Sequence, residues 1–423
     1  MQNKDSKWIV YKFGGVSIQS AEAVKNVCKI IAANKNSNLL VVFSAMGKMT
    51  NAFEKLVEHY YHKQTNELSK LIDEIYKYHL NIINNLFEKP QKAIDSINDI
   101  FDELRSELDK PFSQDFDYEY DRIVSFGELI SGKIISLYLT EAGIQNRWID
   151  IRKNIITDST FRNAQIQWKT TIENISNNIK PDGNIKITQG FIASSVSGET
   201  TTLGREGSDF SAAVLAYSLS AEKMIIWKDV PGVMNADPRI FSDAEKISEL
   251  NYKETVELAY YGAQVIHPKT IKPLQNKNIP LFVKSFSAPD DRGTIIDNRK
   301  NLKISKPIII IKNSQTIISV MPKDFSFINE NNISLIFKVL SHLKIKVNLM
   351  ENSAVSFSLV VDSSDKTKEL INKLSDNFNV KYNENLTLYT FRHYNKEFIN
   401  NLLTDKNIYI EQKTRHTARY VVK

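Results

Sequence analysis

The sequence predicts an α/β fold with a mainly parallel sheet, followed by a smaller α+β region. Over the first two thirds of the chain, short apolar runs of strand length alternate with segments whose apolar residues recur at helical spacing. The composition then shifts to a turn-rich stretch at 287–305, which indicates a domain boundary. The predicted strands of the first domain are 8–13, 39–44, 147–151, 185–192, 223–227 and 279–283.

A long helical segment interrupts this alternation between the second and third predicted strands. Apolar residues recur at helical spacing from 51 to 141, and only Pro90 and Pro111 break the pattern. We therefore expect a helical insertion at about 52–115. Its many lysines and glutamates are typical of solvated helix faces.

The region after the turn-rich stretch predicts two small modules of similar type. Strands are expected at 307–311, 316–321, 345–349 and 355–361, helices at 333–343 and 366–377, and a shortened second repeat at 385–422. The predicted organisation is a first domain at 1–290, a linker at 291–306 and a two-module region at 307–423.

Composition and charge narrow the class of protein. The 423 residues are 42% hydrophobic and 25% charged, as in a soluble globular protein, and a formal net charge of +6 is too weak to predict a nucleic-acid partner. The first residues are polar, unlike a secretory signal, and no apolar run is long enough to span a bilayer. The single cysteine, Cys28, lies among apolar residues at helical spacing. We expect a cytoplasmic protein that contacts no membrane.

The first motif is a glycine turn between a strand and a helix. Lys12 precedes Gly14 and Gly15, Ser17 follows them, and a helix-like segment comes next. Two glycines let the backbone approach an oxyanion, a helix N-terminus favours an anion, and a lysine ammonium neutralises a phosphoryl group. The motif indicates a phosphate site, although an ordinary strand, turn and helix has the same pattern.

Two further groups of polar residues follow predicted strands. Ser44 and Thr50 come after the second strand, at the edge where open α/β sheets bind ligands, although Thr50 equally suits a helix N-cap. At 204–211, two glycines flank Arg205, whose planar guanidinium suits a carboxylate, and Ser208 and Asp209 open a helix. An N-cap would explain Asp209 alone but not the glycine, arginine, glycine arrangement, so we interpret this segment as functional.

A loop rich in turn residues follows the strand at 223–227. Proline and glycine at 231–232 and aspartate and proline at 237–238 predict a rigid, irregular loop. Such a loop, which holds Lys228, Asp229 and Arg239, is able to wrap a nucleotide. A purely structural loop is the alternative.

Six segments, taken together and in order, resemble the aspartate kinase family. They are 12–18, 44–51, 125–131 around Glu128, 204–211, 228–239 and 261–268. The tail resembles, more loosely, the paired ACT regulatory modules that follow this kinase domain. The resemblance implies the three-layer amino-acid-kinase fold with a mainly parallel sheet, followed by α+β ACT-like modules.

The resemblance also implies an activity. Aspartate kinases phosphorylate the β-carboxylate of L-aspartate with Mg-ATP to give 4-phospho-L-aspartate, the first step of lysine, threonine and methionine biosynthesis. The residue types suit this reaction, because a carboxylate is already ionised at neutral pH and needs no general base. The implied cofactors are ATP and Mg²⁺, with Mg²⁺ carried on the phosphates and by water rather than by a cage of carboxylates.

The same resemblance assigns roles to individual residues. Lys12 is expected to stabilise the transferred phosphoryl group and Asp209 to orient Lys12, so these are the expected catalytic residues. The implied nucleotide-binding residues are Lys12, Gly14, Gly15, Ser17, Lys228, Asp229, Met234 and Arg239. The implied aspartate-binding residues are Ser44, Thr50, Glu128, Arg205 and Ser208. No side chain is expected to bind a metal directly.

Several positions depart from the family pattern. Val16 replaces the usual threonine, and Glu206 replaces a frequent glycine. Lys228 and Gln264 replace a threonine and a lysine found in some bacterial members, and we interpret Lys228 as supplying the charge lost at Gln264. Asn348 stands where an effector-contacting aspartate is common. The sequence therefore leaves open which amino acid, if any, is the effector.

Other interpretations remain. Sheet edges and apolar faces of the ACT-like modules predict a homodimer. His267 and Pro268 are interpreted as the start of a helix rather than as part of the site. Another carboxylate-directed amino-acid kinase, or a catalytically silent amino-acid-binding regulator, is the alternative function. Arg205 with Glu128 disfavours the first alternative, and the phosphoryl-directed Lys12 disfavours the second.

Overall fold

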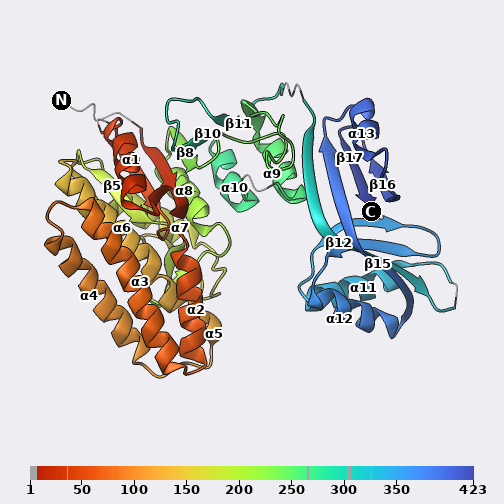
Figure 1. Ribbon diagram of the computed structural model, residues 1–423, viewed down its shortest axis with the longest axis horizontal. Coiled ribbons are helices and arrows are strands. Elements are labelled where there is room, and N and C mark those ends of the chain that lie inside the picture. Colours follow the sequence, from red (N-terminus) through yellow and green to blue (C-terminus); the bar gives the residue numbers. More distant parts are fainter. Residues whose placement is uncertain (1–6, 36, 264–265, 303, 305, 325) are drawn as a thin grey trace. The chain divides into compact units, whose positions relative to one another are not determined.

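The structure, a computed structural model, describes residues 7–423 except 36, 264–265, 303, 305 and 325. It divides into two compact units (Figure 1). Unit 1 comprises Met1–Val233, Lys246–Val256 and Val265–Leu302, and unit 2 comprises Met234–Glu245, Glu257–Gln264 and Lys303–Lys423. Two short segments that precede the predicted boundary at 290 therefore pack with unit 2.

Unit 1 is built on an eight-stranded sheet in the order β3-β5-β2-β1-β8-β10-β11-β9. Every neighbouring pair is parallel except β10 and β11. Strands β2 and β5 are buried along their whole length, since helices cover both faces of the sheet. The strands are β1 (Ile9–Phe13), β2 (Leu39–Phe43), β3 (Asn146–Ile149), β5 (Ile185–Gln189), β8 (Lys223–Lys228), β9 (Glu249–Asn251), β10 (Leu281–Ser285) and β11 (Thr294–Asp297). The predicted α/β fold with a mainly parallel sheet is confirmed.

The predicted strand at 185–192 is confirmed as β5 over 185–189, but its predicted end is wrong, because Ile192 belongs to a strand of a different sheet. Strand β5 ends at Gln189, and β6 (Ile192–Ser195) lies between β4 (Ile156–Thr157) and β7 (Thr200–Thr202) in a small separate sheet. Phe191 turns the chain with a φ of 70°. Gly190, directly before Phe191, is a turn signal that marks this break, and the predicted boundary at 192 did not take it into account.

Helices of unit 1 occupy the stretches between these strands. The predicted helical stretch from 51 to 141 forms α2 to α6. Two of these, α5 and α6, make the only described stretch long and apolar enough to cross a membrane, but 78% of that apolar window is buried inside the fold. The helices are η1 (Gly15–Ile18), α1 (Ala21–Ala32), α2 (Met49–Tyr61), α3 (Thr65–Leu86), α4 (Gln91–Leu108), α5 (Phe116–Val124), α6 (Phe126–Glu141), η2 (Ile151–Lys153), α7 (Trp168–Asn178), α8 (Gly207–Ser218), α9 (Tyr252–Tyr261, shared with unit 2) and α10 (Pro268–Asn276).

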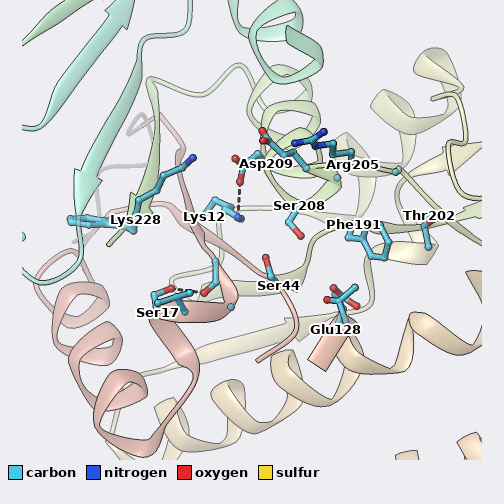
Figure 2. Close-up of a pocket in the computed structure, with 18 of the residues that line it drawn as sticks. Lys12, Ser17, Ser44, Glu128, Phe191, Thr202, Arg205, Ser208, Asp209 and Lys228 are labelled. Carbon is cyan, nitrogen blue, oxygen red and sulfur yellow. Dashed lines mark hydrogen bonds and ion pairs between the residues drawn. The ribbon is translucent and has the colours of Figure 1, made fainter. Parts of the chain in front are cut away.

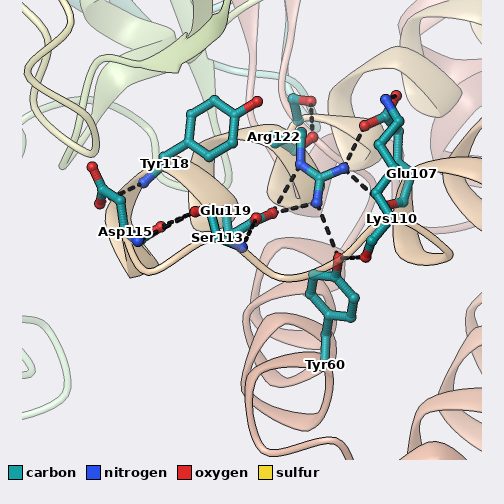
Figure 3. Close-up of polar contacts among 9 residues, drawn as sticks. Tyr60, Glu107, Lys110, Ser113, Asp115, Tyr118, Glu119 and Arg122 are labelled. Carbon is teal, nitrogen blue, oxygen red and sulfur yellow. Dashed lines mark hydrogen bonds and ion pairs between the residues drawn. The ribbon is translucent and has the colours of Figure 1, made fainter.

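A partly buried arginine links the long helices to the helix that carries part of the site (Figure 3). Arg122 on α5 forms ion pairs with Glu119 and with Glu107 near the end of α4, and donates to the Tyr60 hydroxyl on α2 at 3.3 Å. Two carboxylates thus neutralise one partly buried cation. Because α5 runs directly into α6, this cluster helps to fix the start of α6.

Unit 2 is a six-stranded antiparallel sheet in the order β13-β14-β12-β15-β17-β16. The predicted strands at 307–311 and 316–321 are one long strand, β12, whose pairing with β15 shifts register between Lys312 and Ile317. Because β12 and β15 run through both modules, the modules share one sheet. The elements are β12 (Ile308–Pro322), β13 (Val347–Asn352), β14 (Phe357–Asp362), β15 (Phe378–Arg392), β16 (Ile408–Lys413), β17 (Thr417–Val422), α11 (Glu330–His342), α12 (Asp365–Ser375) and α13 (Lys396–Leu403).

Candidate active site

A cavity of about 630 Å³ opens at the carboxyl ends of β1, β2 and β8 in unit 1. It brings together all of the sequence-predicted site residues except Met234 and Arg239. These two lie in unit 2 and do not line the cavity; the Arg239 side chain is 85% exposed and pairs with Asp237 at 2.7 Å. The predicted residues that line it are Lys12, Gly14, Gly15, Ser17, Ser44, Thr50, Glu128, Arg205, Ser208, Asp209, Lys228 and Asp229.

An ion pair joins β1 to α8 inside this cavity (Figure 2). The Lys12 ammonium lies 2.6 Å from a carboxylate oxygen of Asp209, and the two side chains are only 12% and 5% exposed. Helix α8 begins at Gly207 and its N-cap is Glu206, so the alternative that Asp209 is an N-cap is wrong. Asp209 instead sits in the first turn, where a carboxylate is favourable, and holds the ammonium beside the open space.

The two glycines after β1 have different surroundings. A Cβ added to Gly15 would lie 2.4 Å from the carbonyl oxygen of Gly47, and the Gly47 N–H donates to the Gly15 carbonyl at 3.0 Å. Gly15 therefore lets the turns after β1 and β2 touch. A Cβ on Gly14 would meet only the Lys12 ammonium, at 3.6 Å, so Gly14 keeps the backbone beside that ammonium open. The Ser17 hydroxyl donates to the Gly14 carbonyl at 2.6 Å and fixes the turn.

The helix-like segment expected after these glycines is α1, but the helix does not follow them directly. A short 3₁₀ turn, η1, follows them, and α1 begins only at Ala21. Ser20 caps α1, because its hydroxyl accepts the Ala23 N–H at 3.2 Å. The long helix whose first residues line the cavity is α8, through Gly207 to Asp209. Thr50 is also not an N-cap, since α2 begins at Met49.

Glu206 adopts a left-handed backbone with a φ of 54°, a conformation that favours glycine. Its carboxylate accepts the His267 N–H at 3.0 Å. His267 itself caps α10, with Pro268 as the first helical residue, which confirms the predicted helix start. Glu206 therefore has a strained backbone, while its carboxylate links the start of α8 to the start of α10.

Glu128 on α6 is buried at the aspartate side of the predicted site. One of its carboxyl oxygens accepts the Ala45 N–H at 3.3 Å, and the other has no hydrogen-bond partner in the described part of the chain. Burial raises the pKa of Glu128 to about 8. A buried carboxyl with an unused oxygen is suited to a cationic ligand group.

Arg205 and Lys228 add positive charge to the lining of the cavity. Arg205 lies in the loop before α8, is exposed to the cavity, and makes no hydrogen bond or ion pair with any described residue. Lys228 is the last residue of β8, and Asp229 follows it. Gln264 lies outside the described residues, so the interpretation that Lys228 replaces its charge stays a prediction.

Sequence reasoning missed several residues that line the cavity. Phe191 follows Gly190 at the end of β5, a signal of the same kind as the other strand ends. Arg162, with a φ of 63°, comes from a loop that carries no such signal. Its N–H donates to buried Asp121 at 2.9 Å, and Asp121 also accepts the N–H of Thr202 at 2.7 Å. Burial raises the pKa of Asp121 to about 6.

Known proteins share this chain's sequence and fold. The model of the amino acid kinase family matches residues 7–285. Lysine-sensitive aspartokinase 3 of Escherichia coli is 31% identical over 367 residues, which make up 86% of this chain and 80% of that protein. The chain belongs to the aspartokinases of the amino acid kinase family. Its recognition as an aspartate kinase, a phosphotransferase, is thereby confirmed.

Two solved aspartokinase structures match over nearly the whole chain. Escherichia coli aspartokinase III in complex with aspartate and ADP has a TM-score of 0.81 and 28% identity, covering 98% of this chain and 96% of that chain. The same enzyme in complex with lysine and aspartate has a TM-score of 0.82 and 29% identity, covering 99% and 96%. The expected aspartokinase fold, with its ACT-like tail, is confirmed.

Proposed function

We propose that the chain transfers the γ-phosphoryl group of Mg-ATP to the β-carboxylate of L-aspartate in this cavity. The observation that carries the proposal is that one cavity holds three groups: the Lys12–Asp209 ion pair, the Arg205 guanidinium and the buried Glu128 carboxyl. Among the described residues, the guanidinium and one oxygen of that carboxyl have no partner. These groups match the phosphoryl group, the α-carboxylate and the ammonium of the two substrates. Aspartate and ADP are both bound in the related E. coli structure.

The reaction needs no proton transfer. A β-carboxylate oxygen forms a bond to the γ-phosphorus, the bond from that phosphorus to the β–γ bridging oxygen breaks, and ADP leaves with its electron pair. The chemical difficulty is the repulsion between two anions. Lys12 offsets the charge on the transferred group, and Asp209 holds the ammonium in place before the substrates arrive.

The remaining residues position the substrates. Arg205 pairs with the α-carboxylate of aspartate and Glu128 with its ammonium, while Ser44, Thr50 and Ser208 bind the rest of the molecule. The nucleotide is held by Gly14, Gly15, Ser17, Lys228 and Asp229, and the assignment of Met234 and Arg239 to it stays a prediction. Mg²⁺ enters as part of the nucleotide substrate, with water ligands.

The quaternary state, effector and location belong to the same proposal. We propose a cytoplasmic homodimer, formed through the ACT-like modules. Apolar side chains before and within α11 and near β14 are exposed, with Phe327 at 73%, Leu335 at 37% and Val355 at 43%, and a second copy would cover them.

Buried, unpaired Cys28 suits a reducing compartment, in keeping with the proposed cytoplasmic location. An amino-acid effector is part of the proposal, but its identity stays open.

A substrate panel tests the proposed activity. The purified chain is incubated with Mg-ATP, hydroxylamine and one carboxylic acid at a time, so that any acyl phosphate is trapped as a hydroxamate. We expect product from L-aspartate, and none from L-glutamate or N-acetyl-L-glutamate. Product from another acid but not from aspartate would favour a different carboxylate kinase, and no product from any acid would favour a silent regulator.

A further inference from the structure

Unit 2 contains a cavity of its own, of about 660 Å³. Its walls come from the second half of α11, from β13, from the end of α9, and from β16 and β17. None of the residues that line it lines the kinase cavity. The cavity is therefore a separate candidate for a ligand.

A buried arginine on β17 forms one wall. Arg419 is 8% exposed, donates to the Asn348 carbonyl at 2.6 Å and to the Thr390 hydroxyl at 3.4 Å, and lies over the Tyr261 ring at 5.0 Å. These partners are neutral, so in the described part of the chain the guanidinium has no carboxylate counter-ion. Burial lowers the pKa of Arg419. Two acceptors leave most of the five guanidinium donors unused, and a buried cation of this kind favours an anionic ligand.

The other charged group at this cavity is also a cation. The Lys346 ammonium lies 5.2 Å from the centre of the Tyr260 ring. The described residues that line the cavity include no aspartate or glutamate. A ligand ammonium group would therefore meet two positive charges and no compensating carboxylate.

The Asn348 side chain also lines the cavity, but it does not change the positive charge there. Its amide nitrogen donates to Gln315 at 2.8 Å and to Asp362 at 2.9 Å, and its amide oxygen accepts from Lys312 at 2.8 Å. The side chain is thus occupied by internal hydrogen bonds. It offers the cavity little further capacity for a polar ligand group.

The rest of the wall is largely apolar. Phe337 and Leu340 on α11 and Leu349 on β13 line the cavity, and Phe337 is 39% exposed. We propose that this cavity binds a small monocarboxylate with an apolar chain and no ammonium group. Its carboxylate pairs with Arg419, and its chain packs against these three side chains.

Calorimetric titration of the full chain tests the ligand class. The probes are 4-methyl-2-oxopentanoate, L-leucine, which has the same chain with an ammonium group, L-lysine and inorganic phosphate. We expect saturable binding of the oxo acid, with at least tenfold weaker binding of leucine, lysine and phosphate. No binding of the oxo acid, or equal affinity for leucine or phosphate, would overturn the proposal.

Three variants locate the bound probe. Arg419→Met and Lys346→Met are each expected to weaken binding of the oxo acid, the first at least tenfold, while Lys338→Met, an exposed lysine of α11 outside the cavity, is expected to leave it unchanged. Arg419 also donates to the Asn348 carbonyl, so if Arg419→Met does not fold, the affinity of Lys346→Met decides the question. Unchanged affinity in Lys346→Met and in folded Arg419→Met would contradict the assignment.

Discussion

At the scale of single residues, the role that we propose for Glu128 predicts that aspartate binding depends on pH. Its pKa of about 8 means that it is mostly protonated at neutral pH in the empty site, yet it must ionise to pair with the ammonium of aspartate. We therefore expect the KM for aspartate to fall as pH rises from about 6.5 to about 8, by up to about tenfold per pH unit, with a flatter kcat. Steady-state kinetics across this range measure both constants.

Glu128→Gln provides the comparison for this pH dependence. The variant cannot ionise at this position, so its KM is expected to be higher and nearly independent of pH in the same range. A flat KM in the original chain, or the same slope in the variant, would contradict the assigned role.

Substitution of Val16 measures how much a hydroxyl group beside the glycine turn contributes to kcat. Its side chain is 47% exposed and lines the cavity. Val16→Thr adds one hydroxyl near the proposed phosphate site, where a single neutral hydrogen bond is worth about 1 kcal/mol, so we expect kcat to rise by less than about tenfold. A larger increase would mean that Lys12 and the backbone carry less of the phosphoryl stabilisation than we propose.

At the scale of elements, the contact between the turns after β1 and β2 depends on Gly15. Gly15→Ala would force a Cβ against the Gly47 carbonyl, and we expect it to lower the free energy of unfolding of unit 1 by about 1–3 kcal/mol. Gly14→Ala is the matched control, since its Cβ has room, and should change stability by less than about 1 kcal/mol. Urea unfolding measures both, and equal effects would contradict this difference between the glycines.

The elements also show what the sequence could and could not predict. The polar residues that follow predicted strands include most of the predicted residues that line the cavity. This is because the carboxyl ends of parallel strands lie at the same edge of a sheet. The break at Phe191 was missed although Gly190 before it is a turn signal, and the continuity of β12 was missed because a hydrophobic pattern does not report a bulge within a strand. Arg162 was missed because a contact with distant Asp121 places it, and no local motif reports such a contact.

At the scale of the whole molecule, the proposed homodimer predicts a change in assembly. Leu335→Glu places a charge on the exposed apolar face of α11, and we expect it to shift the protein from dimer to monomer in sedimentation velocity. Lys338→Glu, on the same helix, is the control for added negative charge and should stay dimeric. A monomeric original chain, or a Leu335→Glu dimer of unchanged stability, would contradict the proposed interface.

The proposal that Lys12 stabilises the phosphoryl group in transfer is central to the function of the molecule. The most direct measurement is the kcat of Lys12→Met in the aspartate hydroxamate assay with saturating Mg-ATP, beside Lys29→Met, an exposed lysine of α1, as control. We predict a loss of about 10²–10³-fold for Lys12→Met and none for the control, since removal of one charge-stabilising donor has an effect of this size. Turnover of folded Lys12→Met close to that of the original chain would contradict the proposal.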